Sequence, residues 1–221
     1  LKKLLECDRL KEIFKDEKHR KKIYDEVCEE DGSLKEDCKY MASIDLHLGK
    51  EVYVSTWENP KILKENETFS IQPGEFAILP TEEEVYIPKD MLAFIAVRFT
   101  YKRKGLINVS GFHVDPGYKG HIIFSVYNAG AHPVTLRRGD KVFTIFFAKL
   151  IEKVESGYGE GYGEKIELAL VEEVRGFPPL NLVKLNERVL SLESRFSTMV
   201  SLLLSILGVM IATIITIVIM R

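Results

Sequence analysis

The chain of 221 residues is 46% apolar and 29% charged, so it can bury one sizeable core and still carry appendages. Its 31 basic and 33 acidic residues give a net charge of −2, and both signs are mixed along the chain. This balance argues against duplex DNA or RNA as a partner, because proteins that bind them usually carry a basic patch.

The N-terminal segment, residues 1–40, places apolar residues at helical spacings among many charges. The pattern predicts two helices, broken near Asp31-Gly32-Ser33, with the charges on a solvated face. Cys7, Cys28 and Cys38 form no Cys-x-x-Cys pair. Their odd number and their spacing predict free thiols in a reducing compartment, with neither a disulfide framework nor a metal site.

From Ala42 the pattern changes to short runs rich in Val, Ile, Phe and Tyr, separated by turn residues such as Pro73-Gly74 and Pro116-Gly117. Many short strands at regular spacing, without helices between them, predict a mainly β fold, either a barrel or a double-sheet roll. The predicted β domain covers residues 41–154.

Residues 155–179 break this pattern with glycines that alternate with Tyr158 and Tyr162, namely Gly157, Gly159, Gly161 and Gly163. No lysine or arginine lies among these glycines, as it would in a phosphate-binding loop, so a mobile arm or linker is the favoured interpretation. The prolines of Phe177-Pro178-Pro179 end the predicted globular part.

The C-terminal region predicts one long helix in two parts, a coiled-coil stalk at 180–198 and a transmembrane helix at 199–220. Residues 199–220 carry no charge, and ~33 Å of helix is enough to cross a hydrocarbon core of ~30 Å. Apolar residues in steps of three and four form a heptad seam that runs into the span: Leu182, Leu185, Val189, Leu192, Phe196, Met199, Leu203, Ile206 and Met210. The seam predicts a parallel coiled coil that continues through the bilayer.

The charges around the span predict its orientation. Charged residues throughout Leu1–Leu10 leave no room for a secretory signal, so the sequence predicts a single-pass, tail-anchored membrane protein. Lys184, Arg188 and Arg195 precede the span and only Arg221 follows it. The positive-inside bias therefore places the N-terminal head in the cytoplasm.

Three motifs in the β-rich region resemble those of dCTP deaminases. Residues 42–49, Ala-Ser-Ile-Asp-Leu-His-Leu-Gly, resemble the family's Ser-Ile-Asp-Leu-Arg-Leu-Gly. Residues 98–106, Arg-Phe-Thr-Tyr-Lys-Arg-Lys-Gly-Leu, resemble Arg-Ser-Ser-x-x-Arg-x-Gly-Leu, and residues 114–120 resemble the Asp-Pro-Gly-Phe/Trp-x-Gly turn. The resemblance covers about residues 41–150. It implies the β-roll of dCTP deaminases and dUTPases, which assembles as a homotrimer with nucleotide sites at subunit interfaces.

Carried over residue by residue, the resemblance implies a nucleotide site made of Arg98, Thr100, Arg103, Asp115, Tyr118 and Gly120. Arginines suit a triphosphate because guanidinium groups donate bidentate, permanently charged hydrogen bonds. Thr100 replaces one family serine, whereas Phe99 cannot replace the other. Asp115 and Tyr118 match positions that hold the deoxyribose, and dUTPases also use this aspartate to orient the hydrolytic water.

The catalytic glutamate of dCTP deaminases falls on Ser125 in this chain. A hydroxyl cannot take up and deliver protons near neutral pH as a carboxylate does, and such a loss typically costs on the order of 10²–10⁴ in rate. The sequence supports dUTPase activity only slightly better than it supports deaminase activity. Asp115 is present as its catalytic residue, but the family glutamine falls on Thr144, and Glu160 and Glu164 would repel phosphates.

The leading hypothesis is therefore a membrane-anchored trimer whose head binds or senses a nucleotide, has lost deaminase activity and is coupled to the membrane helices. An active dCTP deaminase or dUTP pyrophosphatase is one alternative, and a trimeric structural scaffold at the membrane is another. The sequence indicates no cofactor of its own, and it leaves Mg²⁺ open only as the companion of a bound nucleoside triphosphate.

Overall fold

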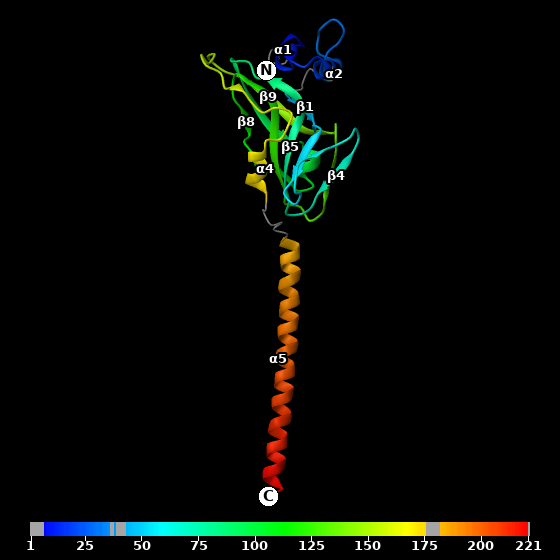
Figure 1. The fold of residues 1–221 in the computed structure, drawn as a ribbon, viewed down its shortest axis with the longest axis vertical. Helices are drawn as coiled ribbons and strands as arrows, with labels where there is room; N and C mark the ends of the chain where they lie inside the picture. Colours follow the sequence, from blue (N-terminus) through cyan, green and yellow to red (C-terminus); the bar gives the residue numbers. More distant parts are fainter. Residues whose placement is uncertain (1–6, 36–37, 39–42, 176–181, 221) are drawn as a thin grey trace. The chain divides into compact units, whose positions relative to one another are not determined.

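The computed structural model of the chain describes residues 7–35, 38, 43–175 and 182–220. The chain divides into two compact units, Leu1–Pro179 and Leu180–Arg221. The first unit, the head, is built mainly from β-strands, and the second contains the single long helix α5 (Leu182–Ile219) (Figure 1). The predicted fold class, a dUTPase-like β-roll with N-terminal helices and a C-terminal apolar helix, is confirmed.

Two larger sheets and a strand pair make up the head. The first sheet contains β12 (Gly159–Glu160), β9 (Tyr118–Asn128), β5 (Phe76–Tyr86), β2 (Glu51–Val54) and β3 (Lys61–Ile62) in that order, and β7 (Leu106–Asn108) also pairs with β9. The second sheet has the order β1 (Ser43–His47), β11 (Lys141–Lys149), β6 (Met91–Val97) and β8 (His113–Val114). The pair consists of β10 (Val134–Arg137) and β4 (Thr68–Ile71). Neighbouring strands are antiparallel except β12 and β9.

The core lies between the inner faces of the two larger sheets. Strand β9 alternates buried and more exposed residues along its whole length, as a strand with one core-facing side must. Its buried Phe124 stacks on Phe143 of β11, with ring centroids 4.0 Å apart. Because successive side chains point to opposite faces, the neighbouring Ser125 is directed to the outer face of the same strand.

Helices α1 (Cys7–Ile13) and α2 (Glu17–Val27) cover one end of the head (Figure 1). Two helices were predicted here, but the predicted break near residues 31–33 is wrong. The chain breaks between Ile13 and Glu17, because Asp16 caps α2 by accepting a hydrogen bond from the backbone N–H of His19 at 2.9 Å. Residues 31–33 form the turn that follows α2.

The prediction of three free thiols is also wrong, because Cys7 and Cys28 are joined in a disulfide. The two residues are separated by 21 positions, but the packing of α1 against α2 brings their Cα atoms to 6.1 Å, within the range that a disulfide can bridge. Spacing along the sequence does not reveal such a meeting of two helices. Cys38 is buried and lies outside this bond.

Helix α5 contains a segment, Leu185–Ile219, that is long and apolar enough to cross a membrane, and an 18-residue window within it has a mean hydropathy of 2.9. Its hydroxyl groups bond within the helix: Ser205 donates to the carbonyl of Ser201 at 2.8 Å, and Thr216 donates to that of Ala212 at the same distance. These bonds satisfy the hydroxyls inside one helix.

Candidate functional site

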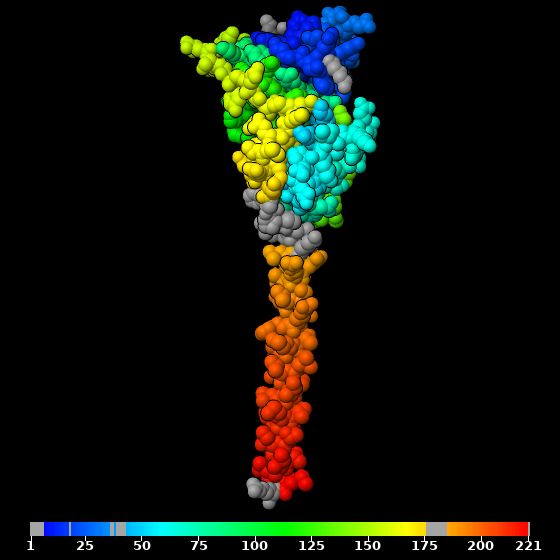
Figure 2. Space-filling view, viewed as in Figure 1, coloured from blue at the N-terminus to red at the C-terminus, as the bar shows by residue number. Residues whose placement is uncertain are grey.

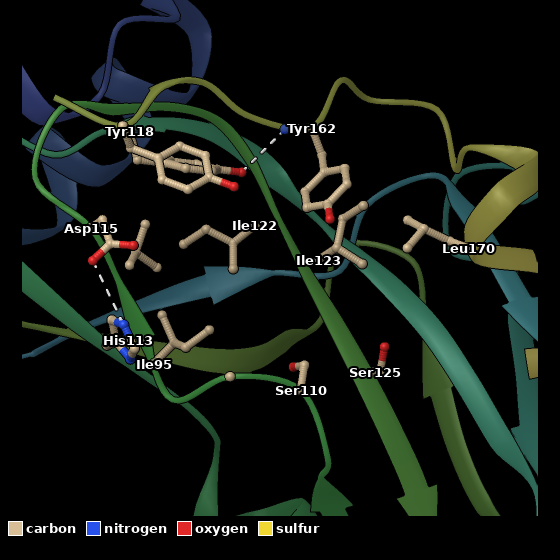
Figure 3. A pocket seen from close by; sticks show the side chains of 13 residues that line it. Ile95, Ser110, His113, Asp115, Tyr118, Ile122, Ile123, Ser125, Tyr162 and Leu170 are labelled. Atoms are coloured by element: carbon tan, nitrogen blue, oxygen red, sulfur yellow. Dashed lines mark hydrogen bonds and ion pairs between the residues drawn. The ribbon is translucent and has the colours of Figure 1, made fainter. Parts of the chain in front are cut away.

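A cavity of about 260 Å³ lies on the outer face of β9, beside the turn that joins β8 to β9. Strands β6, β8 and β9, the loop before β8 and the segment after β11 supply its walls. Thirteen residues line it, namely Ile95, Ser110, Gly111, His113, Val114, Asp115, Tyr118, Ile122, Ile123, Ser125, Tyr158, Tyr162 and Leu170 (Figure 3). Most of this lining is apolar or aromatic, so the few polar groups determine its chemistry.

Asp115 and His113 form the charged corner of the cavity. Their side chains point toward each other, with His113 Nε2 3.6 Å from Asp115 Oδ1, and both are about half exposed (Figure 3). The ring of Phe112 packs edge-on against His113, with centroids 5.0 Å apart. The sequence reasoning missed His113, although its position two residues before Asp115 on an extended segment places both on one side.

Tyr118 begins β9 and is 7% exposed. Its hydroxyl donates to the backbone carbonyl of His121 and accepts a hydrogen bond from the backbone N–H of Tyr162 at 3.4 Å. The ring lies against that of Tyr158, with centroids 5.7 Å apart. Burial raises the pKa of Tyr118 to about 12, so its hydroxyl stays protonated near neutral pH.

Residues 155–165, called here the glycine strap, lie along this face of the head (Figure 2). Its β12 pairs in parallel with the start of β9, and three backbone hydrogen bonds of 2.7–2.9 Å join Tyr158, Gly161 and Tyr162 to the turn and to β9. The interpretation of this segment as an arm or linker is therefore corrected: it is an ordered wall of the cavity.

The glycines of the strap allow this close approach. A Cβ atom on Gly161 would lie 2.1 Å from the ring of Tyr118, and one on Gly157 would lie 2.8 Å from the Cα of Gly117. Gly120, one of the predicted nucleotide-binding residues, is buried where the strap crosses, and a Cβ there would lie 2.7 Å from the carbonyl oxygen of Tyr162. It does not line the cavity.

Ser125 lies on β9 and lines the cavity, as does Ser110 from the loop before β8 (Figure 3). Its backbone carbonyl accepts from the N–H groups of Val109 and Ser110, at 2.8 and 3.3 Å. Among the described residues that line the cavity, Asp115 is the one carboxylate. The position predicted for a lost acid thus lines the cavity, and Asp115 is the one acid among the described lining residues.

The predicted phosphate ligands lie elsewhere in the single chain. Arg98 precedes the short helix α3 (Phe99–Lys102), donates to the carbonyl of Lys141 at 3.2 Å and pairs with Asp45 at 3.1 Å. Thr100 is exposed on α3, and Arg103 lines a different pocket. The predicted set therefore separates into two groups, Asp115, Tyr118 and Ser125 at one cavity and the arginines with Thr100 around α3.

In residues 7–35, 38, 43–175 and 182–220, no three His, Cys, Asp or Glu side chains come together as metal ligands. Mg²⁺ brought in by a triphosphate stays a prediction, because such an ion is held largely by the phosphates and by one or two carboxylates.

Comparisons of the sequence with a family model and with known proteins indicate the same family. The family model described as dCTP deaminase-like matches residues 13–150. A dCTP deaminase from Sulfurisphaera tokodaii is 34% identical over 144 residues, covering 60% of this chain and 78% of the relative. A dCTP deaminase from Idiomarina loihiensis is 39% identical over 90 residues, covering 40% of this chain and about half, 46%, of the relative.

Solved structures with a similar fold include two enzymes. The dCTP deaminase from Agrobacterium tumefaciens has a TM-score of 0.44 and 19% identity, covering 62% of this chain and 48% of that one. The dUTPase from Streptococcus mutans has a TM-score of 0.38 and 19% identity, covering 59% of this chain and 94% of that one.

Proposed function

Because the chain belongs to the dCTP deaminase-like family, whose model covers more than half of its length, we propose that its head binds a nucleotide without deaminating it. The proposal joins two features of one cavity. The groups that would hold a nucleoside are present, and the group that would move protons for deamination is absent.

The residue that carries this proposal is Ser125. By the resemblance to the family motif, its position corresponds to that of the family's catalytic glutamate. It lies in the cavity with Asp115 as the one described carboxylate of the lining. Hydrolytic loss of an amine needs a group that accepts a proton from water and passes it on, which a serine hydroxyl does not do near neutral pH. The proposed site therefore keeps Asp115 and the aromatic rings that would hold a nucleoside, and it lacks the carboxylate that deamination requires.

The remaining lining suits a nucleoside. Asp115 can accept a hydrogen bond from a sugar hydroxyl, and the rings of Tyr118 and Tyr162 offer apolar faces against which a sugar or base packs. Relatives named dCTP deaminase indicate a deoxycytidine nucleotide as the first ligand to examine. The volume of about 260 Å³ suits a nucleoside without its phosphate chain.

A homotrimer would complete this site. In one chain, Arg98 and Arg103 do not line the cavity of Asp115, so one copy alone supplies no guanidinium to a nucleotide bound there. We propose that three copies assemble with sites at their interfaces, where the arginines of one copy face the cavity of the next. The heptad seam of α5 favours parallel chains, and three are among the strand numbers that it allows.

We further propose that α5 anchors the head to a membrane, with the head in the cytoplasm. The basic residues Lys184, Arg188 and Arg195 before the apolar stretch support this side. Disulfides are rare in the cytoplasm. Cys7 and Cys28 are only 3% and 4% exposed, however, so soluble reductants reach the bond only when α1 and α2 separate.

Hydrolysis of dUTP is the second candidate function, favoured by the pair of Asp115 and His113 at the cavity. An aspartate that orients water is sufficient for phosphate hydrolysis when the triphosphate is otherwise held. The absence of a glutamine at Thr144 and the acidic residues of the strap weigh against it.

Calorimetric titration tests the proposal, with the full chain in nanodiscs of phosphatidylcholine and dCTP as the ligand. We expect saturable binding that Asp115→Ala weakens about tenfold or more, because a hydrogen bond to a charged group is lost. The matched control is Glu152→Ala, which removes an exposed acid away from the cavity. Absence of binding to wild type, or equal binding by Asp115→Ala, would contradict the proposal.

A further inference from the structure

The outer face of the first sheet continues beyond the cavity in a row of three paired residues. Ser125 of β9 pairs with Ile78 of β5, and Ile78 pairs with Tyr53 of β2. Residues directly opposite one another in antiparallel strands direct their side chains to the same face of the sheet. Because neighbouring strands lie ~4.8 Å apart, the row runs about 10 Å from Ser125 to Tyr53. The sheet surface that carries Ser125 in the cavity therefore extends across two further strands.

Tyr53, at the end of this row, is completely buried and its hydroxyl is not hydrogen-bonded. Its exposed fraction is 0%, and no donor or acceptor in the described part of the chain bonds its Oη atom. A buried tyrosine hydroxyl usually finds a partner, because a hydroxyl without one loses its hydrogen bonds to water and gains none in return. A ligand that offers a hydrogen bond to Tyr53 Oη would therefore be favoured at this position.

Helix α4 (Leu168–Val174) covers the row at Tyr53. Its Val171 is buried in a cluster with Tyr53 and Ile78, and this cluster is separate from the main core between the sheets. The neighbouring Leu170 packs against the same cluster and also lines the cavity (Figure 3). Leu170 is thus the boundary between the open cavity and the part of the sheet that α4 covers.

The contacts that hold α4 on the sheet are few. The helix has seven residues, of which Val171 is the buried one, and no side chain bonds its N-terminus. Helices this short are marginal on their own. On one side of α4, the backbone N–H of Ile166 donates to Glu51 Oε2 at 2.6 Å, and on the other, Arg175 donates to the carbonyl of Glu58 at 2.8 Å. A segment with so little buried apolar surface can separate while the main core stays folded.

We propose that α4 covers a second compartment of the nucleotide cavity, which a ligand with a second ring occupies by displacing the helix. Tyr53, Ile78 and the partly buried Trp57 would line this compartment. They offer apolar and aromatic faces to a ring, and Tyr53 Oη offers a hydrogen bond to its edge. The inference rests on the proposed function for the first nucleoside, the one at Asp115.

A dinucleotide is the class of ligand that this arrangement favours. The cavity of about 260 Å³ suits one nucleoside, and the covered floor adds about 10 Å. A purine in place of a pyrimidine is too small a change to span that length, whereas a second nucleoside spans it. The buried residues of the cluster are Tyr53, Ile78, Ile166 and Val171, and none of them is charged. The compartment therefore suits an uncharged base better than a phosphate.

Tyr53→Phe separates ligand binding from stability. The full chain in phosphatidylcholine nanodiscs is titrated by calorimetry with the dinucleotide pdCpdC and, separately, with dCTP. We expect the variant to lose about three- to tenfold in affinity for pdCpdC and to keep its affinity for dCTP. Its Tm should be at least that of wild type, because the unpartnered hydroxyl is gone. Tyr86→Phe, on β5 outside the cavity lining, is the control and should change none of these values.

Val171→Ala tests the displacement of α4. Weakening the closed form helps a ligand that binds only the open form, so affinity for pdCpdC should rise by about three- to tenfold. Affinity for dCTP, which leaves α4 in place, should not rise. In wild type, pdCpdC but not dCTP should speed hydrogen exchange of the amides of residues 168–174. Leu168→Ala, at an exposed position of the same helix, is the control and should bind like wild type.

Failure of this inference can be told apart from failure of the proposed function. If wild type binds dCTP but not pdCpdC, or if both Tyr53→Phe and Val171→Ala bind pdCpdC as wild type does, α4 covers no ligand compartment. Such a result leaves dCTP binding at Asp115 untouched. If wild type binds neither ligand, both proposals are wrong. Binding of pdCpdC that depends on Tyr53, without dCTP binding, would support the compartment and contradict dCTP as the ligand.

Discussion

Three side chains around β8 and β9 decide what the candidate site can do. Asp115 follows β8, Tyr118 opens β9, and Ser125 lies further along the same strand, so all three belong to one short stretch of backbone. Asp115 offers a charged acceptor and Tyr118 a hydroxyl that stays protonated. Ser125 offers a hydroxyl and no acid, and the proposal of binding without deamination rests on this residue.

His19 and Glu82 are expected to make the attachment of α2 depend on pH. Contact with Glu82, whose Oε1 lies 3.6 Å from His19 Nε2, raises the pKa of His19 and lowers that of Glu82 to about 2. The His19 contribution is full below its unfolded pKa of about 6.5 and is lost as the pH rises through the raised value. The Glu82 contribution is full above about 4.5 and is lost as the pH falls through about 2.

Thermal unfolding of the full chain, followed by circular dichroism, measures this effect. We expect the Tm to fall between pH 5.5 and pH 8 by about 2–4 °C for each kcal/mol that His19 contributes, and His19→Gln to remove that part of the change. Glu82→Gln should have the same effect, and the double variant should lose no more than either single one. Additive losses would show that the two residues do not act as a pair.

The glycine strap is the element that turns an open sheet face into a cavity. Tyr158 and Tyr162 of the strap line it, and Leu170 of α4 (Leu168–Val174) adds a further wall (Figure 3). Helix α4 follows the strap in the chain. It packs against the head through Val171, which is buried in a cluster with Tyr53 and Ile78. The strap is therefore held at both ends, at β9 and at the α4 packing site.

Gly161→Ala is expected to displace the strap, because the new Cβ would lie 2.1 Å from the ring of Tyr118. Hydrogen exchange of the backbone amides of residues 157–162 should become faster, and dCTP affinity should fall by about tenfold as one wall is lost. Gly163→Ala is the matched control, since a Cβ there meets nothing within 4 Å. Equal exchange in the two variants would refute the role assigned to Gly161.

Helix α5 offers a separate test of assembly. Leu192 lies on the heptad seam, whereas Glu187 lies on the other side of the helix, at 3.6 residues per turn. In a Cys38→Ser background, Leu192→Cys should form disulfide-linked chains under mild oxidation, and Glu187→Cys should form few. Crosslinking that is equally efficient at both positions would contradict a parallel bundle packed along the seam.

Much of the head could be predicted from local patterns. Runs rich in Val, Ile, Phe and Tyr mark β9 and β11, and three motifs in order identify the family. The motif residues Asp115, Tyr118 and Ser125 line one cavity. The remaining features depend on contacts between distant segments. The Cys7–Cys28 bond needs the packing of two helices, the strap needs the backbone of β9, and the distance of Arg103 from Asp115 depends on the whole sheet arrangement.

In the proposed function, the head is a nucleotide-binding module and α5 is the apolar helix that carries it. The head brings two unlike pockets, one with an aromatic lining around Asp115 and one with the basic residues around Arg103. The two pockets share no lining residue, and in the proposed trimer a nucleotide would use the aromatic pocket of one copy and the basic residues of the next. Occupancy of such a site would bind the copies to each other, and α5 would carry that change to the membrane.

The most direct test of this account is dCTP turnover under conditions in which calorimetry shows the sites to be saturated. The account predicts that the full chain binds dCTP and releases no ammonia above the buffer background, while the Sulfurisphaera tokodaii dCTP deaminase assayed in parallel does. Ammonia release that is abolished by Asp115→Ala would contradict it. Such a result would show that the cavity deaminates without an acid at position 125.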